Sequence, residues 1–558
     1  MRLALVVGLL IGAWQLPAYA QGEAPTPAPA APPSAAAAAA VEHVPLSLAD
    51  AISQGIENNT NVQLVRFDPP IAELEHTAAW GAHDPTLYGD YGYRSTKLPF
   101  ASTFFPSQFV ERNSSGGAGL QGLVPRLGWT YQVGYEGVGN QTNSLIQTLG
   151  TTYTSSLTAR LAAPLLKGAW WGSAWTRVEV TGIQSELALE QFREGLIDIV
   201  ASIEVGYWNL AARKQALEVA NKSLETARKL LEQSKAQYDV GVVSRVEVTE
   251  AEAGVAQREF DQILVLNRYR DAQDELVDRV YGPRLTPTSQ LEIEPTDRPE
   301  SYVIFDLDPE VSTQRAMARR PDLAIARQQV EQSEILLKYA KNARLPQLDL
   351  VGSYGTHGLS GNNPNCPFGT SKDPGAATCS TNPLDPPVTT FPLEQPTGVG
   401  TRYSDNDDFW FDGNDNRVWL AGAVLSLPIP NTTARANVSI SELQLRKART
   451  NVRRVEQSIV QGVRSSVRNL ASSLEGIEAA ERATAASGEQ LRAERIRLEH
   501  GESTPFEVLL REQDFVDAER RRIEALQAYH SSVTTLDRNQ GTLLEDRSIV
   551  LDRALPLR

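Results

Sequence analysis

Two stretches of the chain carry the same pattern around a glycine: residues 238–248 read YDVGVVSRVEV, and residues 498–508 read LEHGESTPFEV. An offset of 260 residues (501 − 241) places Gly241 on Gly501 and Glu247 on Glu507. Self-similarity over this distance predicts a duplicated chain with an internal two-fold sequence repeat. Further pairs at the same offset are Leu231 with Leu491, Glu252 with Glu512, Leu266 with Leu526, and Tyr269 with Tyr529.

A long helix is expected before each glycine. In the first copy, Leu217, Leu224 and Leu231 recur at intervals of seven residues, as in a coiled-coil seam. Helices of more than 60 residues are roughly 100 Å long and do not form the interior of a globular domain. Apolar periodicity predicts long helices over 175–240 and 432–498, and return helices over 243–281 and 505–545.

Three segments alternate between apolar and polar residues, which is typical of β-strands, and a fourth at 418–427 is apolar on both faces. Leu87, Tyr91 and Tyr93 share one face of the first segment, and Asp90 and Arg94 share the other. An apolar outer face and a polar inner face suit a transmembrane barrel, which four strands are too few to close. Closure therefore implies an oligomer, and three copies would supply 12 strands (3 × 4). The strands are predicted near 87–97, 152–164, 348–356 and 418–428.

Two further segments lie among these strands. Residues 357–417 are rich in Pro, Gly and Asn and are predicted to form an extracellular insertion. Cys366 and Cys379 lie in it, and an oxidising compartment predicts a disulfide between them. The stretch 120–139 is also β-like, as either an extracellular hairpin or an upward extension of the barrel. The acidic stretch 405–415 fits no EF-hand spacing and is interpreted as a solvated loop.

The N-terminus indicates export. Arg2 precedes an apolar run that is too short to span a membrane, and Ala18-Tyr19-Ala20 is a cleavage-site pattern. The segments are predicted as a signal peptide at 1–20, an Ala/Pro-rich linker at 21–45, a first repeat at 46–300, a second repeat at 301–545 and a C-terminal tail at 546–558.

Composition excludes several classes of protein. The 558 residues carry a formal charge of −15, which does not suit a nucleic-acid partner. Two cysteines exclude a disulfide framework and a four-cysteine metal site. The mean hydropathy of −0.30 excludes a polytopic helical membrane protein. No catalytic, metal-ligating or cofactor-binding constellation occurs at usable spacing, so neither an enzyme nor a cofactor is predicted.

Together these features resemble the TolC-type outer-membrane factors, also called the outer membrane efflux protein family. The resemblance covers roughly residues 46–545, including the duplicated strand–helix plan, both glycine turns, and Pro164 and Pro428 at strand ends. It implies an α+β membrane protein in which three protomers form a 12-stranded barrel, continued by a periplasmic helical tunnel. It also implies outer-membrane lipids, a periplasmic adaptor, and a proton-driven or ATP-driven inner-membrane pump as partners in a Gram-negative cell.

The resemblance also implies roles for residues at the two turns. Some family members have an arginine two positions after the second tip glycine, where this chain has Ser503. Glu247 and Glu507 are either first-turn carboxylates favoured by the helix dipole or, in a trimer, a charged ring that favours cations. The implied adaptor-docking residues are Val240, Gly241, Val242, His500, Gly501 and Glu502, and the implied gate residues are Tyr238, Glu247 and Glu507.

The sequence therefore predicts a passive exit duct of a tripartite efflux pump or a type I secretion system. Drugs, metals, small metabolites and polypeptides all remain open as cargo. The first alternative is a structural or adhesive coiled-coil surface protein without transport activity, which the repeated glycine turn disfavours. A periplasmic enzyme on a helical scaffold is the second alternative, disfavoured by the missing catalytic constellation.

Overall fold

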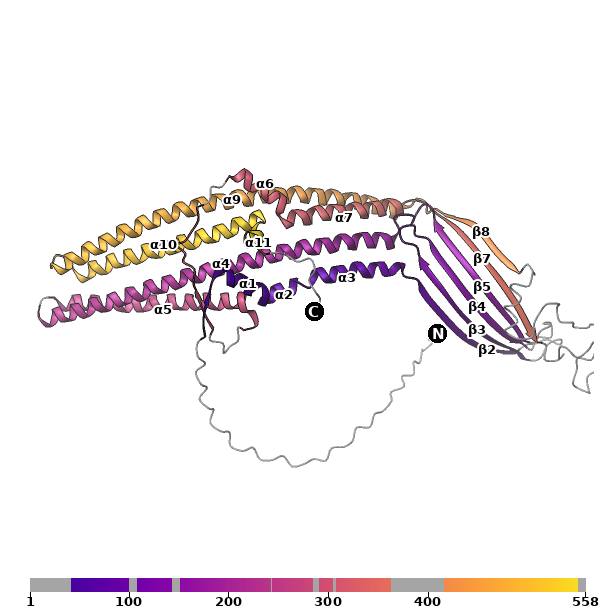
Figure 1. Cartoon of the computed structure of the whole chain (residues 1–558), viewed down its shortest axis with the longest axis horizontal. Helices are drawn as coiled ribbons and strands as arrows, with labels where there is room; N and C mark the ends of the chain where they lie inside the picture. Colours follow the sequence, from indigo (N-terminus) through magenta and orange to yellow (C-terminus); the bar gives the residue numbers. More distant parts are fainter. Residues whose placement is uncertain are drawn as a thin grey trace, which may run out of the picture.

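The computed structural model describes residues 42–99, 108–142, 151–241, 243–284, 291–304, 308–362 and 416–549. They form a long helical body that continues into a β-sheet at one end (Figure 1). This mixed helical and β architecture agrees with the α+β part of the expected fold class. The predicted signal peptide at 1–20, the cysteines Cys366 and Cys379, and the acidic stretch 405–415 lie outside the described residues.

Two helices of nearly equal length form the helical body: α4 (Ser173–Asp239) and α9 (Thr432–Glu499). Each returns through a shorter helix, α5 (Arg245–Tyr281) and α10 (Pro505–Gln540). The return helices pack along the part of α4 and α9 that is far from the sheet, while α3 and α7 pack along the part near it (Figure 1). The other helical segments are α1 (Leu48–Asn58), α2 (Thr60–Val65), α3 (Asp68–Trp80), η1 (Gly81–His83), η2 (Gly282–Arg284), α6 (Pro309–Arg319), α7 (Pro321–Ala343) and α11 (Leu543–Asp546).

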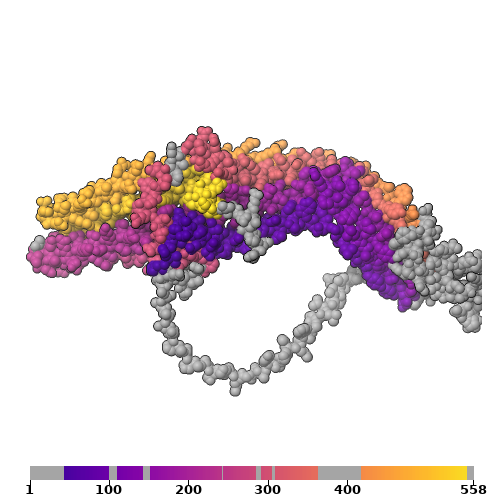
Figure 2. Space-filling view, in the orientation of Figure 1, coloured from indigo at the N-terminus to yellow at the C-terminus, as the bar shows by residue number. Residues whose placement is uncertain are grey.

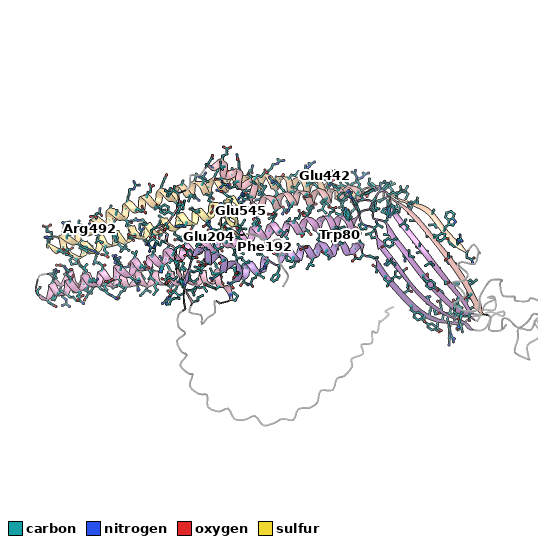
Figure 3. The ribbon with its side chains drawn as sticks, viewed as in Figure 1. Trp80, Phe192, Glu204, Glu442, Arg492 and Glu545 are labelled. Carbon is teal, nitrogen blue, oxygen red and sulfur yellow. The ribbon has the colours of Figure 1, made fainter. Side chains whose placement is uncertain are left out.

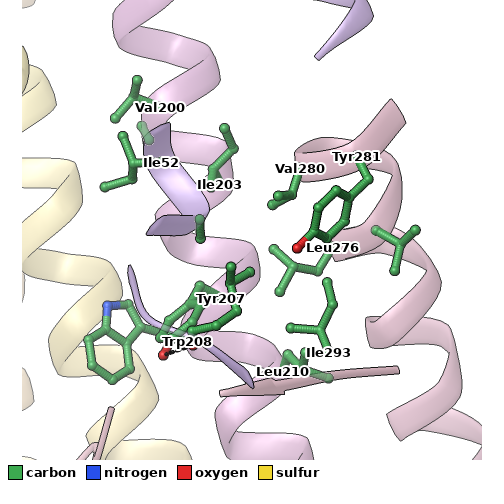
Figure 4. Close-up of a cluster of buried hydrophobic side chains, with 14 of the residues drawn as sticks. Ile52, Val200, Ile203, Tyr207, Trp208, Leu210, Leu276, Val280, Tyr281 and Ile293 are labelled. Carbon is green, nitrogen blue, oxygen red and sulfur yellow. Dashed lines mark hydrogen bonds between the residues drawn. The ribbon is translucent and has the colours of Figure 1, made fainter. Parts of the chain in front are cut away.

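The main buried core lies in the middle of the helical body, where α1 packs between α4 and α5 (Figure 4). Ile203 and Leu276 are fully buried there, from α4 and α5 respectively. Tyr207 is fully buried too, and its hydroxyl donates to the carbonyl of Leu46 at 3.0 Å and to Asp297 at 2.6 Å. A second core joins α9, α10, α6 and α7. None of the described helices combines the length and the apolarity that a membrane-crossing helix needs.

Within the described residues, the larger sheet contains six strands in the order β2-β3-β4-β5-β7-β8, and all neighbours are antiparallel. The expectation of two strands in each half is therefore wrong: the first half supplies four and the second supplies two. The stretch 120–139 is neither an extracellular hairpin nor an upward extension, because it comprises the end of β3, the connection 124–129 and most of β4, and these strands lie side by side with β2 and β5. The bounds are β2 (Thr86–Pro99), β3 (Gln108–Leu123), β4 (Thr130–Thr142), β5 (Thr151–Pro164), β7 (Gln347–Asn362) and β8 (Arg417–Ser426).

Three predicted boundaries differ from the structure. The linker expected to end at residue 45 overlaps β1 (Glu42–Leu46), which pairs in parallel with β6 (Leu291–Pro295) beside the main core. The insertion expected from residue 357 begins later, since β7 continues to Asn362. The segment expected as a tail from residue 546 instead remains packed through Ile549, which lies against the main core.

Candidate functional site

The two glycine turns lie together at the end of the helical body that is farthest from the sheet, where the space-filling view shows them as two projecting fingers (Figure 2). One finger is formed by α4 and α5 and the other by α9 and α10. The return helices approach each other closely near this end, because a Cβ atom on Gly254 of α5 would lie 2.7 Å from Leu509 of α10. The fold therefore brings together two turns that are 260 residues apart in sequence (501 − 241).

The first tip is closed by a glycine and a capping box. Gly241 has φ +79°, and its amide donates to the carbonyl of Tyr238 at 2.9 Å. That backbone conformation costs a glycine little, because it has no Cβ atom. Ser244 is the N-cap of α5, and both its amide and its hydroxyl donate to Glu247 Oε1 at 3.2 Å. Glu247 thus completes a capping box in the first turn of α5.

The second tip has the same backbone path and a different set of side chains. Gly501 has φ +75°, and its amide donates to the carbonyl of Leu498 at 3.0 Å. The Thr504 hydroxyl accepts from the amide of Glu507 at 3.3 Å, and Pro505 begins α10. Proline suits this position because the first helical amide has no partner within the helix.

Side chains at both tips are presented to solvent in the single chain. Val240 and Tyr238 are 74% and 44% exposed, and Gly241, Gly501, His500 and Glu502 are exposed as well. A Cβ atom on either tip glycine would meet nothing within 4 Å. Exposed apolar side chains at such an end are typical of a surface that contacts another protein. Val242, the remaining residue of the predicted docking set, lies outside the described residues.

Ser503 takes part in contacts within its own tip. Its hydroxyl donates to Glu494 of α9, and Glu494 also pairs with Arg497 at 3.3 Å. One turn further along, Arg495 of α9 pairs with Glu512 of α10 at 2.8 Å. Ser503 therefore ties the turn of this finger to α9, and the Arg495–Glu512 pair joins α9 to α10.

An ion pair repeats at the two tips at the same 260-residue offset. Lys235 pairs with Glu252 at 3.0 Å in the first finger, and Arg495 pairs with Glu512 at 2.8 Å in the second. The burial of the carboxylates differs, because the side chain of Glu252 is 52% exposed and that of Glu512 only 7%. The ion pairs could have been predicted from the repeat in the sequence, because a basic residue recurs at 235 and 495 and a glutamate at 252 and 512, both at the offset of 260 residues.

A buried polar cluster in the middle of the body was not predicted from the sequence. Glu204 of α4 is fully buried, and it accepts from Arg547 Nε at 2.6 Å and from the Thr534 hydroxyl at 2.8 Å (Figure 3). Arg547 also lies 3.7 Å from Asp537 of α10. Burial raises the pKa of Asp537 to about 7, although the nearby guanidinium acts in the opposite direction. The cluster fastens the segment after α10 to α4.

Sequence comparison identifies the family. The family model described as outer membrane efflux protein matches residues 112–278 and 313–542. The chain belongs to this family. It is 23% identical over 440 residues to outer membrane protein TolC of Escherichia coli, and the match covers 78% of each chain. The predicted family membership and the outer-membrane location are therefore confirmed, and the family is one of transport channels.

Solved outer-membrane channels share the fold of this family member. The CmeC channel of Campylobacter jejuni has a TM-score of 0.58 at 14% identity, covering 91% of this chain and 90% of CmeC. The open state of the MtrE channel of Neisseria gonorrhoeae has a TM-score of 0.58 at 16% identity, covering 90% of this chain and 93% of MtrE. At these identities the likeness establishes the fold alone.

Proposed function

We propose that three copies of the chain form a duct through the outer membrane and the periplasm, which carries solutes outward without an energy source of its own. An inner-membrane transporter, either proton-driven or ATP-driven, would supply the energy within a tripartite efflux pump or a type I secretion system. The main support is the placement of both glycine tips at one end of the body and of the sheet at the other. The long helices separate these ends by roughly 100 Å, since each residue adds about 1.5 Å.

The tips would dock a periplasmic adaptor protein, as the family resemblance implies. The proposed contact residues are exposed and follow tight turns whose backbone is fixed by local hydrogen bonds. A rigid tip loses little conformational freedom when a partner binds, which favours association. The proposed docking residues are Val240, Gly241, Val242, His500, Gly501 and Glu502.

Tyr238, Glu247 and Glu507 would lie near the periplasmic opening of the trimer. The capping role of Glu247 is compatible with a second, electrostatic role, because its partners Ser244 N and Oγ are neutral donors and bring no compensating positive charge. Three copies would place six carboxylates (3 × 2) around one opening. Rings of carboxylates favour cations over anions.

The test is the reversal potential of the purified protein in planar bilayers under a KCl gradient. The Glu247→Gln/Glu507→Gln variant removes both charges, and glutamine at position 247 retains the capping box because it also accepts from the N-cap. We expect it to lose cation preference. Glu442→Gln, at the opposite end of α9 (Figure 3), is the matched control and should leave the potential unchanged. An unchanged potential in the double variant would limit both glutamates to helix capping, and a particle mass other than three chains would refute the trimer.

A further inference from the structure

The hairpin formed by β3 and β4 is built into the sheet along its whole length. β2 pairs with β3 from Thr86 opposite Gln121 to Pro99 opposite Gln108. On the other side, β4 pairs with β5 from Thr130 opposite Ala162 to Gln141 opposite Thr151. The hairpin therefore has the same span as its neighbours, as expected of a structural part of the wall and not of a surface loop.

An exposed apolar row crosses this hairpin without a break. Leu87, Leu120 and Val133 are 80%, 40% and 45% exposed, and Tyr354 and Trp419 are 51% and 73% exposed. In a membrane barrel such a face contacts lipid, and lumen-facing residues alternate with it. The complete row, in register over six strands, is Leu87, Leu120, Val133, Ala159, Tyr354 and Trp419.

The row one position away lies on the opposite face of the sheet and is mainly polar. Within the hairpin it contains Gln121, which is opposite Gln132, and Gln132 is in turn opposite Arg160 of β5. Residues of a strand alternate between the two faces, so the hairpin has an apolar face and a polar face exactly where its neighbours have them. The complete polar row is Thr86, Gln121, Gln132, Arg160, Ser353 and Leu420.

Glycines of the hairpin accommodate a side chain from β2. Tyr88 lies across Gly119 and Gly134, where a Cβ atom on either glycine would overlap its hydroxyl. Gln132 of β4 donates to that hydroxyl through Nε2 at 2.9 Å. Tyr88 of β2 thus packs against both β3 and β4, which indicates that the hairpin and β2 form one packed wall.

We propose that β3 and β4 are membrane-spanning strands and that the assembled wall has 18 strands, six from each of three copies (3 × 6). Within the described residues, β2 and β8 each pair on one side only, and a bilayer does not tolerate unpaired strand edges. The second copy supplies the missing partner, with β8 of one protomer beside β2 of the next. This proposal rests on the trimer of the proposed function.

The strand number has a consequence for the width of the exit. Barrel diameter grows roughly linearly with strand number, so 18 strands give a pore about 1.5 times as wide as 12. Barrels of about 16 to 18 strands enclose an aqueous channel of porin type. The extracellular exit of an 18-stranded wall then passes bulkier solutes than the exit of a 12-stranded wall. The opening at the tips would set the size limit for cargo.

Site-directed labelling tests the position of the hairpin. In a Cys366→Ser/Cys379→Ser background, single cysteines replace Leu120, Gln121, Gln132 and Val133 and carry a fluorophore. In bilayers with brominated lipid, we expect strong quenching at 120 and 133 and weak quenching at the matched positions 121 and 132. A water-soluble quencher should give the reverse order. Equal quenching at all four positions, or weak lipid quenching at 120 and 133, would overturn the membrane-spanning assignment.

Electron cryomicroscopy of the protein in nanodiscs tests the strand number. The wild type should have 18 strands around its axis. A variant lacking residues 108–142 removes two antiparallel strands, leaves β2 antiparallel to β5, and should form a wall of 12 strands with a diameter smaller by about one third. A wild-type wall of 12 strands would refute the proposal even if the deletion variant fails to fold. A particle mass other than three chains would refute the trimer and leave the labelling result valid.

Discussion

The two halves of the chain agree closely in their helices and differ in their strands. The long helices have 67 and 68 residues and the return helices 37 and 36, whereas the first half has four strands in the large sheet and the second has two. A helix one turn longer would displace its tip by about 5.4 Å, so tips that act together need helices of equal length. A hairpin satisfies its own backbone hydrogen bonds and returns the chain to the same end of the sheet, so the sheet tolerates an added pair of strands.

The two halves differ in a buried charge, because Glu204 of the first half is fully buried. At the 260-residue offset its counterpart is Arg464, which is exposed. Arg547→Ala should destabilise the protein by about 3–5 kcal/mol, because it leaves a buried charge without its cation. Arg538→Ala is the control, since its partner Asp198 lies at 2.7 Å with both side chains 49% exposed, and exposed pairs contribute about 0–1 kcal/mol. Thermal melting in detergent, followed by the helical circular dichroism signal, measures the stability of both variants. Equal destabilisation by Arg547→Ala and Arg538→Ala would contradict the role of the buried charge.

The same cluster predicts a pH dependence of stability, through Asp537 of α10. The pKa of Asp537 is raised from 3.8 to about 7 in the folded protein, so the folded state binds the proton more tightly than the unfolded state. Stability should therefore fall as pH rises from about 4 to about 7, by an amount on the order of a few kcal/mol. Asp537→Asn should remove most of this loss and melt at a higher temperature than the wild type at pH 8. Parallel melting curves of both proteins from pH 5 to pH 8 would show that Asp537 does not titrate in this range.

The repeated ion pair at the tips allows the same substitution to be compared between the two fingers, with a smaller expected loss of stability. Arg495→Ala leaves the buried Glu512 without a partner and should cost about 1–3 kcal/mol. Lys235→Ala breaks the equivalent exposed pair and should cost less than about 1 kcal/mol. Hydrogen exchange of the helix ends near each tip is the appropriate measurement, because the effect is local. Greater loosening of the first finger than of the second would reverse the prediction.

The tip glycines should respond alike, with a local change in stability. Gly241→Val and Gly501→Val each force a β-branched residue to positive φ, at a cost of about 1–2 kcal/mol confined to the turn. Both variants should reach the outer membrane as trimers and lose export, since the tips are the proposed docking surface. Surface labelling of the membrane fraction and an efflux assay separate these effects. A variant that fails to reach the membrane would contradict the placement of the tips far from the sheet.

Local chemistry made the helices and the tips predictable from the sequence. Heptad spacing over tens of residues defines a long helix, and a glycine followed by a capping residue defines where it turns. The strand pair at 87–97 and 152–164 was predictable because apolar and polar side chains alternate there. In β3 the signal is weak, since Gly116, Gly117, Gly119 and Gly122 carry no side chain to alternate and have low strand propensity.

Tertiary structure alone determined the features that join distant parts of the chain. Two glycines of β3 make room for tyrosines of neighbouring strands, Gly119 for Tyr88 of β2 and Gly122 for Tyr131 of β4. The five-residue strands β1 and β6 are each too short to be recognised, and they pair across about 250 residues of sequence. Glu204 and Arg547 are 343 residues apart, and nothing in the sequence around either residue indicates that a helix would bury the carboxylate against that particular arginine. Period and turn chemistry are properties of a segment, whereas burial and pairing depend on which segments meet.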